Sequence, residues 1–395
     1  MSAVVRVAAR GEGVTEDGRH IAFAAPGDQV AADGAITPGP HHATPPCRHF
    51  PECGGCQLQH LDDAAYAAFV ADRIRTGLAA QQLETEILAP HLSPPFARRR
   101  ASLRAERKGR TVSLGFNAGR SHRIVDIVEC HVLHAELFAL VQPLRRLLAG
   151  QLPDRRSAEI RLTLADQGVD VLIEGIAAEG LEAAEALTAF SETHGLARLA
   201  IDDGYGPQTR WEPQPVTIAL GGYPVGLPHA AFLQATADGE AALVDAVRAG
   251  VGDAATVADL FAGLGTFALA LSHGRRIYAA EAARDAVLAL KAAAGRAQLP
   301  LFVDHRDLYR RPLEAAECAR FEAVVLDPPR SGAEAQMPEL AASGVPRIAY
   351  ASCNPASFAR DARVLVAGGY RLDHVQPVGQ FRWSTHVELV GVFTR

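Results

Sequence analysis

The sequence predicts an α/β protein: a doubly wound parallel sheet, preceded by a strand-rich central domain and a short N-terminal β module. From about residue 230, apolar strand-like runs alternate with alanine-rich helical runs, the pattern of a parallel sheet covered by helices on both faces. Residues 95–175 instead alternate apolar and polar positions around turns, which is typical of half-buried strands. Residues 1–34 hold short apolar runs between glycine-containing turns.

A chain of 395 residues is too long for one ordinary core, so we expect more than one domain. We place one boundary near the end of the linker TPGPHHATPP and the other where the alternation of apolar strands and alanine-rich helices begins. This gives domains at 1–45, 46–229 and 230–395. The composition is globular, and no run approaches the roughly 20 apolar residues that a membrane span needs. We expect a cytoplasmic monomer with no membrane partner.

The elements follow in order from local patterns. Residues 62–81 predict a helix that begins at Asp62, because aspartate accepts hydrogen bonds from the free amides of a first turn. The strand-rich region is interrupted by one further helix, HAELFALVQPLRRLLAG. The C-terminal region runs through the strands ATVADLFAG, RRIYAAE, PLFVDHRD, FEAVVLDPP and VPRIAYASC, with helical segments between them.

Three of the six cysteines, Cys47, Cys53 and Cys56, are spaced C-x5-C-x2-C. So few cysteines in so long a chain do not form a disulfide scaffold, and in a reducing compartment a group like this is typical of metal ligands. The spacing differs from the C-x3-C-x2-C of radical enzymes. Spacing alone leaves a zinc site and an iron–sulfur cluster open.

The segment DLFAGLGTF places Gly263 and Gly265 between a strand and a helix, where a ligand meets the carboxyl end of a strand in a Rossmann-like sheet. Glu281 ends the next strand, where a carboxylate can accept both hydroxyls of a ribose. Ala268 replaces the third glycine of the dinucleotide fingerprint. This favours S-adenosylmethionine over NAD, because S-adenosylmethionine has no pyrophosphate to hold.

Two further strand ends carry reactive side chains. Asp327 precedes two prolines that stiffen its loop, and Cys353 follows a strand of the same predicted sheet. A lone cysteine near a strand is most often an inert core residue. At the carboxyl end of this sheet, Cys353 is a candidate nucleophile instead.

The segment RRRASLRAERKGR, residues 98–110, holds seven basic residues and one acid in a chain of net charge −6. Such density of one sign suits phosphate contacts and predicts RNA binding, although a solvated face is the plainer interpretation. The candidate RNA-binding residues are Arg98, Arg99, Arg100, Arg104, Arg107, Lys108 and Arg110. Phe358, Phe381 and Trp383 are candidates for stacking on a base.

In order along the chain, DLFAGLGTF, LDPPRSG, SCNP and HVELVGVF resemble the S-adenosylmethionine-dependent RNA uracil-5 methyltransferase family. The cysteine motif with a later cysteine resembles the iron–sulfur branch of that family, which modifies 23S ribosomal RNA. The resemblance implies that Cys130 is the fourth ligand of a [4Fe-4S] cluster. It also implies that the N-terminal residues form the start of an RNA-binding TRAM barrel, shortened after GDQVA.

The same resemblance implies roles for individual residues. Cys353 adds to carbon 6 of a flipped-out uridine, and Glu388 removes the proton from carbon 5. The cofactor contacts are Gln234, Phe261, Gly263, Gly265, Thr266, Glu281, Asp307 and Asp327. The family often has asparagine where Thr266 stands. Cys318 matches no motif and is expected to be a bystander.

Three alternatives stay open. The same reaction on transfer RNA is the nearest, and the cysteine group is the feature that separates it. An amino-group methyltransferase is suggested by DPPR, but Arg330 stands where such enzymes carry an aromatic residue. The third is an inactive, metal-stapled RNA-binding protein.

Overall fold

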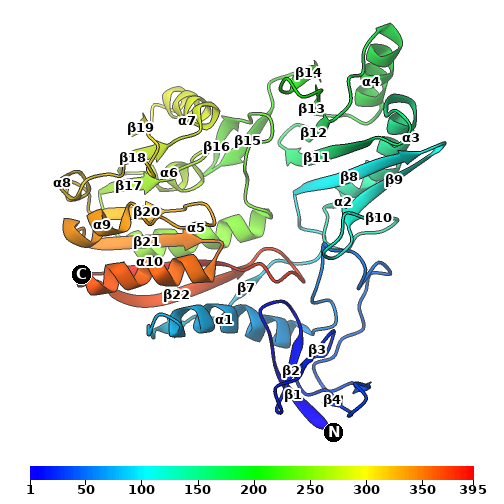
Figure 1. Ribbon diagram of the computed structural model, residues 1–395. Coiled ribbons are helices and arrows are strands. Elements are labelled where there is room, and N and C mark those ends of the chain that lie inside the picture. The colour runs from blue at the N-terminus through cyan, green and yellow to red at the C-terminus, as the bar shows by residue number, and fades with distance from the viewer.

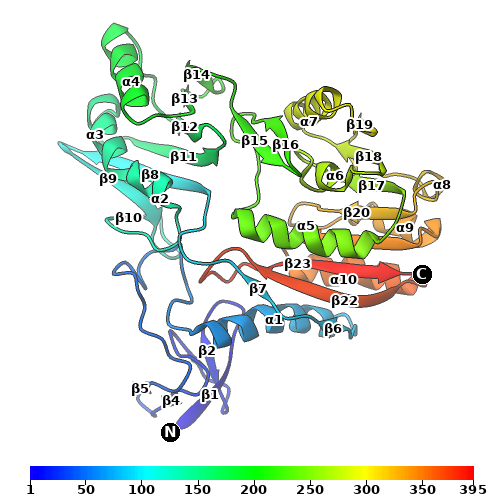
Figure 2. The same ribbon diagram turned by 180° about the vertical axis from the view of Figure 1, so that it is seen from behind.

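The computed structural model describes residues 1–395, which form three regions (Figure 1). A small sheet near the N-terminus lies at one end of the molecule. A strand-rich region and a larger region of sheet and helices stand side by side in both views (Figure 2). No helix combines the length and the apolar character needed to cross a bilayer.

The N-terminal module is an open, antiparallel sheet of five short strands in the order β3-β2-β1-β4-β5. Its buried core consists of Val4, Ala24 and Val30. The predicted β module is present, and one more short strand than expected follows GDQVA. The strands are β1 (Ser2–Val7), β2 (Gly13–Thr15), β3 (His20–Ile21), β4 (Gln29–Val30) and β5 (Ile36–Thr37).

The strand-rich region is a seven-stranded sheet in the order β10-β9-β8-β11-β12-β13-β14. In β8, Ala101, Leu103 and Ala105 are buried while Ser102 and Arg104 are exposed, as a strand with one solvated face requires. The strands are β8 (Arg100–Lys108), β9 (Thr111–Asn117), β10 (Ile124–Asp126), β11 (Ser157–Ala165), β12 (Gly168–Glu174), β13 (Arg198–Asp202) and β14 (Gln208–Trp211). The helices are α2 (Ala135–Ala139), α3 (Val141–Gln151) and α4 (Leu181–Thr193).

The third region is a nine-stranded sheet in which parallel strands occupy one half. The order is β19-β18-β17-β20-β21-β23-β22-β6, with β7 also paired to β22. Its strands are β17 (Thr256–Leu260), β18 (Arg276–Glu281), β19 (Leu301–His305), β20 (Ala323–Leu326), β21 (Arg347–Ser352), β22 (Arg371–Gly379), β23 (Glu388–Thr394), β6 (Glu86–Ile87) and β7 (His91–Leu92). A separate hairpin of β15 (Thr217–Leu220) and β16 (Tyr223–Gly226) precedes it.

Helices cover both faces of this sheet, so the doubly wound prediction is confirmed. Alternate residues along the parallel strands fall into two separate cores, one on each face. One face is covered by α1 (Asp63–Ala79), α9 (Met337–Ser343) and α10 (Pro355–Ala367). The other is covered by α5 (Ala237–Val251), α6 (Thr266–Leu271) and α7 (Arg284–Arg296), and α8 (Ala315–Cys318) is a short peripheral turn of helix.

The predicted central domain at 46–229 is not one packed unit. Helix α1 buries Tyr66, Phe69 and Ile74 in the same core as Phe358 and Phe393 of the C-terminal region. Strand β6 extends the large sheet by pairing with β22. The segment before the strand-rich region therefore belongs to the C-terminal region, because the apolar face of α1 is buried against α10 and β22 (Figure 1).

Candidate active site

A cavity of about 690 Å³ opens at the carboxyl ends of the parallel strands. This is the edge at which doubly wound sheets bind their ligands, and the volume suits a nucleoside-sized molecule with a base beside it. All but one of the predicted cofactor contacts line it together with both predicted catalytic residues: Gln234, Phe261, Gly263, Thr266, Glu281, Asp307, Asp327, Cys353 and Glu388.

Gly265 is the predicted contact that does not line the cavity. It caps α6 in the left-handed region at φ 95°, and a Cβ there would lie 2.4 Å from Cδ1 of Leu290. Its role is therefore to let α6 pack closely against α7. Gly263, at φ 55°, has no atom within 4 Å of an added Cβ, so this glycine faces open space where a ligand can approach the backbone.

Glu281 is held in place by the glycine loop. Its two carboxylate oxygens accept hydrogen bonds from the backbone amides of Gly263 at 2.8 Å and Ala283 at 2.7 Å. Each oxygen keeps a further lone pair for a ligand hydroxyl. The fixed carboxylate at the end of β18 fits the ribose-binding role predicted for it.

The sequence analysis missed Tyr309, which lines the cavity, and Asp259, a buried residue that supports the helix after the glycine loop. The Tyr309 ring lies 5.5 Å from that of Phe261 and forms an aromatic wall of the cavity. Asp259 is fully buried and accepts a hydrogen bond from the amide of Ala268 at 2.8 Å, which fixes the start of α6. The aromatic residue two positions after Asp307 was an available signal for Tyr309. An aspartate inside an apolar strand gave a weaker signal for Asp259.

Cys353 and Glu388 come together through the register of two antiparallel strands. Ser352 of β21 pairs with Leu389 of β23, so the next positions, Cys353 and Glu388, face each other across the strands. Cys353 is partly exposed to the cavity, while Glu388 is 5 % exposed. The sequence placed the nucleophile and the base at the same site only through the family resemblance.

Burial dominates the electrostatics of these acids. Desolvation, then the charges of Glu388 and Asp327, raise the pKa of Cys353 to about 11. Desolvation and Asp327 raise the pKa of Glu388 to about 8. Desolvation and the charge of Glu281 raise the pKa of Asp327 to about 7. The cavity thus holds several acids in a poorly solvated space, an arrangement that favours binding of a cation.

The loop after β21 is tied to the DPPR loop. The Asn354 side chain caps α10 by accepting from the amide of Ala356, and its Nδ2 donates to the carbonyl of Arg330 at 2.9 Å. The hydroxyl of Ser357 donates to the same carbonyl at 3.0 Å. These bonds hold Cys353 beside the loop that carries Asp327 and Arg330.

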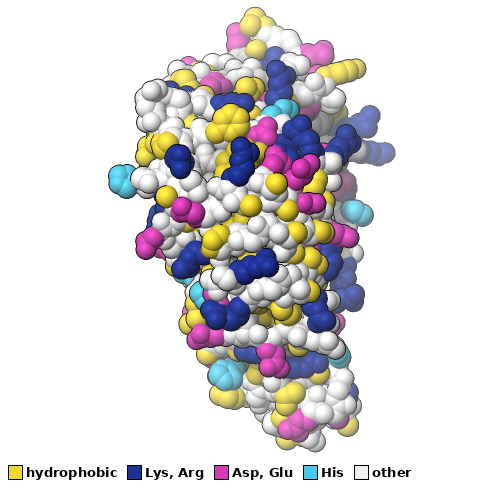
Figure 3. Space-filling view, turned by 90° about the vertical axis from the view of Figure 1, so that its left-hand side faces the viewer, with side chains coloured by type: hydrophobic (Ala, Val, Ile, Leu, Met, Phe, Trp, Pro, Cys, Tyr) yellow, Lys and Arg dark blue, Asp and Glu magenta, His cyan; other side chains and the backbone are white.

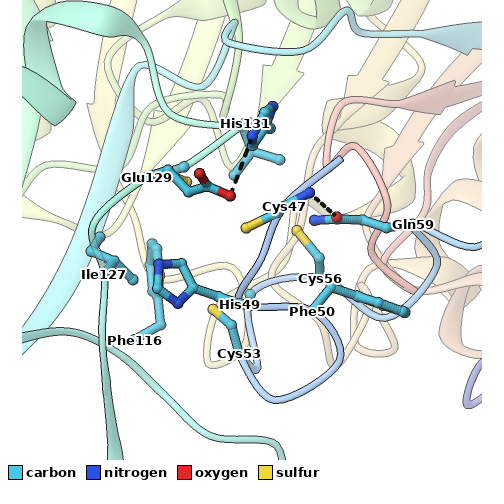
Figure 4. A pocket seen from close by; sticks show the side chains of 13 residues that line it. Cys47, His49, Phe50, Cys53, Cys56, Gln59, Phe116, Ile127, Glu129 and His131 are labelled. Atoms are coloured by element: carbon cyan, nitrogen blue, oxygen red, sulfur yellow. Dashed lines mark hydrogen bonds and ion pairs between the residues drawn. The ribbon is translucent and has the colours of Figure 1, made fainter. Parts of the chain in front are cut away.

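A second cavity is lined by all four predicted cysteine ligands: Cys47, Cys53, Cys56 and Cys130. Figure 4 shows the thiols of Cys47, Cys53 and Cys56 turned toward a common space. All four thiols are free of disulfides. Desolvation raises the pKa of each, in the case of Cys56 to about 12.

The basic segment does not form one surface. Arg99 is 7 % exposed, and it donates to the carbonyl of Gln234 at 3.0 Å and to the carboxylate of Glu240 at 2.5 Å. The prediction of an RNA contact at Arg99 was wrong. The buried Arg99 guanidinium is bonded to Gln234 and Glu240 and so joins the strand-rich region to the C-terminal region. Arg98 and Arg100 lie over the rings of Phe381 and Phe232, at 5.6 and 4.5 Å, and Phe232 lines the large cavity.

The rest of the segment lies on β8 and its hairpin. Arg104 and Lys108 are exposed and paired with Glu159 and Glu106, and Arg110 is exposed. Arg107 is partly covered and donates to the carbonyl of Leu152. On the face shown in Figure 3, basic and acidic side chains are likewise interspersed.

Two of the proposed stacking residues are core residues. Phe358 is fully buried and Trp383 is 7 % exposed, so neither can stack on a base. Phe381 is partly exposed. Phe232, which is 63 % exposed and lines the cavity, is a stacking candidate that the sequence analysis did not single out.

A doubly wound sheet with a glycine loop, a fixed carboxylate at the end of the next strand and a cavity at its carboxyl edge is the arrangement of a class I S-adenosylmethionine-dependent methyltransferase. Comparison with known proteins carries the assignment further. The model of the tRNA (uracil-5-)-methyltransferase family matches residues 304–395. An RNA methyltransferase of Zymomonas mobilis, named as uncharacterised, is 52 % identical over 100 % of both chains. The chain belongs to the RNA uracil-5 methyltransferase family.

Two further relatives have names that state a substrate. The 23S rRNA (uracil(1939)-C(5))-methyltransferase of Halomonas elongata is 32 % identical and covers 91 % of this chain and 78 % of its own. The crystal structure of the tRNA (uracil-54, C5)-methyltransferase of Pyrococcus abyssi, in complex with S-adenosyl-L-homocysteine, has a TM-score of 0.77. It covers 100 % of this chain and 99 % of its own at 21 % identity, and so shows a shared fold. The relatives thus place this chain among the RNA uracil-C5 methyltransferases.

Proposed function

We propose that the protein methylates carbon 5 of a uridine in 23S ribosomal RNA through a covalent adduct between Cys353 and the base. The observation that carries the chemistry is that Cys353 and Glu388, next to the paired residues Ser352 and Leu389 of β21 and β23, line the same cavity. A nucleophile and a base on adjacent strands can act on adjacent atoms of one ring.

Carbon 5 of uracil is a weak nucleophile, so the reaction begins at carbon 6. The thiolate of Cys353 forms a bond to carbon 6, and the electrons of the ring double bond move to carbon 5 and oxygen 4 as an enolate. Bound S-adenosylmethionine would supply the methyl group to carbon 5, and its sulfonium would leave as the neutral thioether of S-adenosylhomocysteine. Glu388 then removes the proton from carbon 5, the double bond reforms, and the thiolate leaves carbon 6.

The residues of the cavity fit the cofactor. Glu281 is fixed where it can accept ribose hydroxyls, and Phe261 with Tyr309 offers an aromatic wall for the adenine. Asp307 also lines this part of the cavity. The buried acids Asp327 and Glu388 favour the positive sulfonium, because its charge offsets their mutual repulsion.

We further propose that Cys47, Cys53, Cys56 and Cys130 hold a [4Fe-4S] cluster. Four thiolates are the usual ligands of this cluster, and its iron atoms would bind the thiols in the deprotonated form that burial otherwise disfavours. No three His, Cys, Asp or Glu side chains lie close enough to hold one metal ion. Zinc would use the same four thiolates, so the preference for the cluster rests on the likeness of the cysteine motif to the iron–sulfur branch of the family.

The cluster would fasten the cysteine loop to the strand-rich region. The amide of Gly54 donates to the carbonyl of Asn117, and Cys53 forms a bridge with Ala118 just after β9. Cys130 follows β10 in the same region. A metal centre at this junction would hold the strand-rich region, which carries Arg104 and Lys108, in a fixed position.

The preference for ribosomal RNA rests on this cysteine set and on the likeness to the Halomonas elongata enzyme. The test is to incubate anaerobically purified protein with labelled S-adenosylmethionine and either protein-free 23S ribosomal RNA or transfer RNA. We expect label in ribosomal RNA as 5-methyluridine. Label in transfer RNA alone would overturn the substrate, and label in neither would favour an inactive RNA-binding protein.

A further inference from the structure

Gln380 lies at the centre of a buried hydrogen-bond network beside the cavity. It follows β22 and is 2 % exposed, and its neighbour Gln234 is 3 % exposed. The chain makes room for it at Gly239 of α5, where an added Cβ would lie 2.6 Å from Cβ of Gln380. Two glutamine side chains buried next to each other need fixed partners, because an unmet amide is costly in the interior.

The backbone determines which way the Gln380 amide points. The amide N–H of Ala235 can only donate, and it donates to Oε1 of Gln380 at 2.7 Å. Nε2 of Gln380 then lies 2.7 Å from Oε1 of Gln234 and donates to it. The oxygen of Gln234 is thereby occupied. Its Nε2 is turned toward Asp327, 3.5 Å from Oδ2, on the wall of the cavity.

Gln380 also reaches the proposed base. Its amide counteracts the rise that burial causes in the pKa of Glu388. Glu388 pairs with Val378 of β22, two positions before Gln380, so the two side chains lie on neighbouring strands. Because its oxygen accepts from Ala235 and its Nε2 donates to Gln234, Gln380 cannot flip its amide without losing both bonds.

We propose that Gln380 is a positioning residue that holds the Gln234 amide with only N–H donors toward the substrate, and so selects uracil over cytosine. The inference rests on the uracil-C5 chemistry proposed above. Carbons 6, 5 and 4 are consecutive in the pyrimidine ring. With Cys353 at carbon 6 and Glu388 at carbon 5, the proposal places Gln234, which lines the same cavity, at carbon 4.

The group on carbon 4 is what separates the two bases. Uracil carries an oxygen there, which accepts a hydrogen bond, whereas cytosine carries an amino group, which donates. An N–H of Gln234 can donate to the uracil oxygen. It cannot bond to the cytosine amino group, because both groups are donors. The same N–H would stabilise the negative charge that reaches oxygen 4 when Cys353 adds to carbon 6, so its loss affects kcat as well as binding.

The test compares Gln380→Met with a matched control, Gln376→Met. Gln376 is a partly exposed residue of β22 whose Nε2 donates to the backbone carbonyls of Ala89 and Pro377, away from the cavity. Each protein is assayed on an RNA that the unaltered protein methylates, with uridine or cytidine at the target position. For Gln380→Met we expect roughly a 100-fold loss of kcat on uridine and at least a tenfold fall in the uridine-to-cytidine ratio of kcat/KM. Gln376→Met should match the unaltered protein.

Gln380→Glu provides a second readout that a purely structural role would not change. The ionised carboxylate that this substitution introduces can only accept hydrogen bonds, so Gln234 must turn its Nε2 toward it and present oxygen to the base. A protonated carboxyl restores the donor. The uridine-to-cytidine ratio of this variant should therefore rise as the pH is lowered, while the ratio of the unaltered protein stays constant, because both bases use the same Cys353 and Glu388.

The outcomes separate the two proposals. If the unaltered protein methylates no uridine in RNA, the proposed function fails. If it does, and folded Gln380→Met or Gln380→Glu keeps the unaltered ratio at every pH, the inference about Gln380 is overturned. Cooperative thermal unfolding shows which variants are folded, and Gln380→Glu provides the test if Gln380→Met does not fold.

Discussion

The thiol of Cys353 and the carboxyl of Glu388 face each other across two antiparallel strands, although 34 residues separate them along the chain. Glu388 lies on β23, which is inserted between β21 and β22 and runs antiparallel to β21. This insertion brings the proposed base next to the nucleophile. Burial raises the pKa of both groups. This pairing leads to the first three predictions.

Replacing Cys353 with Ala should lower methylation by at least roughly 10⁴-fold, because no other group can add to carbon 6. Binding of S-adenosylmethionine should be retained. RNA containing 5-fluorouridine should form a covalent adduct with the unaltered protein, visible on a denaturing gel, since fluorine cannot be removed as a proton. The adduct should be absent in Cys353→Ala and present in Cys318→Ala, whose altered residue is buried away from the cavity. An adduct in Cys353→Ala would contradict the assignment.

Replacing Glu388 with Gln should block the reaction after methyl transfer, because the proton on carbon 5 then has no acceptor. Cys353 would stay bonded to carbon 6 of a methylated base. We expect a covalent complex between protein and ordinary RNA that carries labelled methyl, detected on a denaturing gel. Normal release of 5-methyluridine by Glu388→Gln would show that another group is the base.

The reaction should accelerate with pH. Glu388 acts as a carboxylate, and desolvation with the charge of Asp327 raises its pKa to about 8 in the empty cavity. The ionised, active fraction therefore grows as the pH rises from 6 toward 8. Desolvation and the charge of Glu388 raise the pKa of Cys353, so adduct formation with 5-fluorouridine RNA by Glu388→Gln should shift to lower pH than in the unaltered protein. A shift to higher pH would exclude this coupling.

Loss of one cluster ligand should remove the metal and weaken the fold. Cys56→Ser should lose its bound iron and the visible absorption of an iron–sulfur cluster, and its Tm should fall, since metal binding contributes directly to folding. Cys318→Ser, at a buried cysteine outside the cluster cavity, should keep its iron. Zinc in place of iron in anaerobically purified protein would identify the other kind of four-thiolate site.

Arginines of the same basic segment should differ in function. Arg104→Glu with Lys108→Glu and Arg110→Glu should weaken RNA binding and make the affinity less dependent on salt, because phosphate contacts release counterions. Arg99→Met should leave the salt dependence unchanged and cost about 3 kcal/mol of stability, because Glu240 is left buried without its partner. Binding at several salt concentrations and thermal unfolding measure the two effects.

Local patterns were sufficient for much of this structure. The alternation of strands and helices predicted the doubly wound sheet, and Asp62 marked the start of α1 by accepting from the amide of Ala65. Gly263 and Glu281 could be assigned to one site because they lie at the carboxyl ends of two neighbouring parallel strands, β17 and β18.

Other features depend on contacts between distant segments. Nothing local indicated that α1 would pack on α10, that β23 would pair antiparallel with β21, or that Gln380 would reach Gln234. The prediction for Arg99 failed for a related reason: a run of basic residues in the sequence does not show which of them are buried and which are exposed. These positions are decided by tertiary packing, which overrides local preference.

The addition of α1 and β6 to the large sheet limits how this protein can be divided. A fragment beginning near residue 230 would leave β22 as an unpaired edge and would expose the apolar surface of α10 that α1 covers. Exposed edges of this kind recruit other chains and lead to aggregation. The catalytic half therefore cannot be exchanged between relatives as a simple C-terminal cassette, and a working chimaera must carry residues 63–92 along with it.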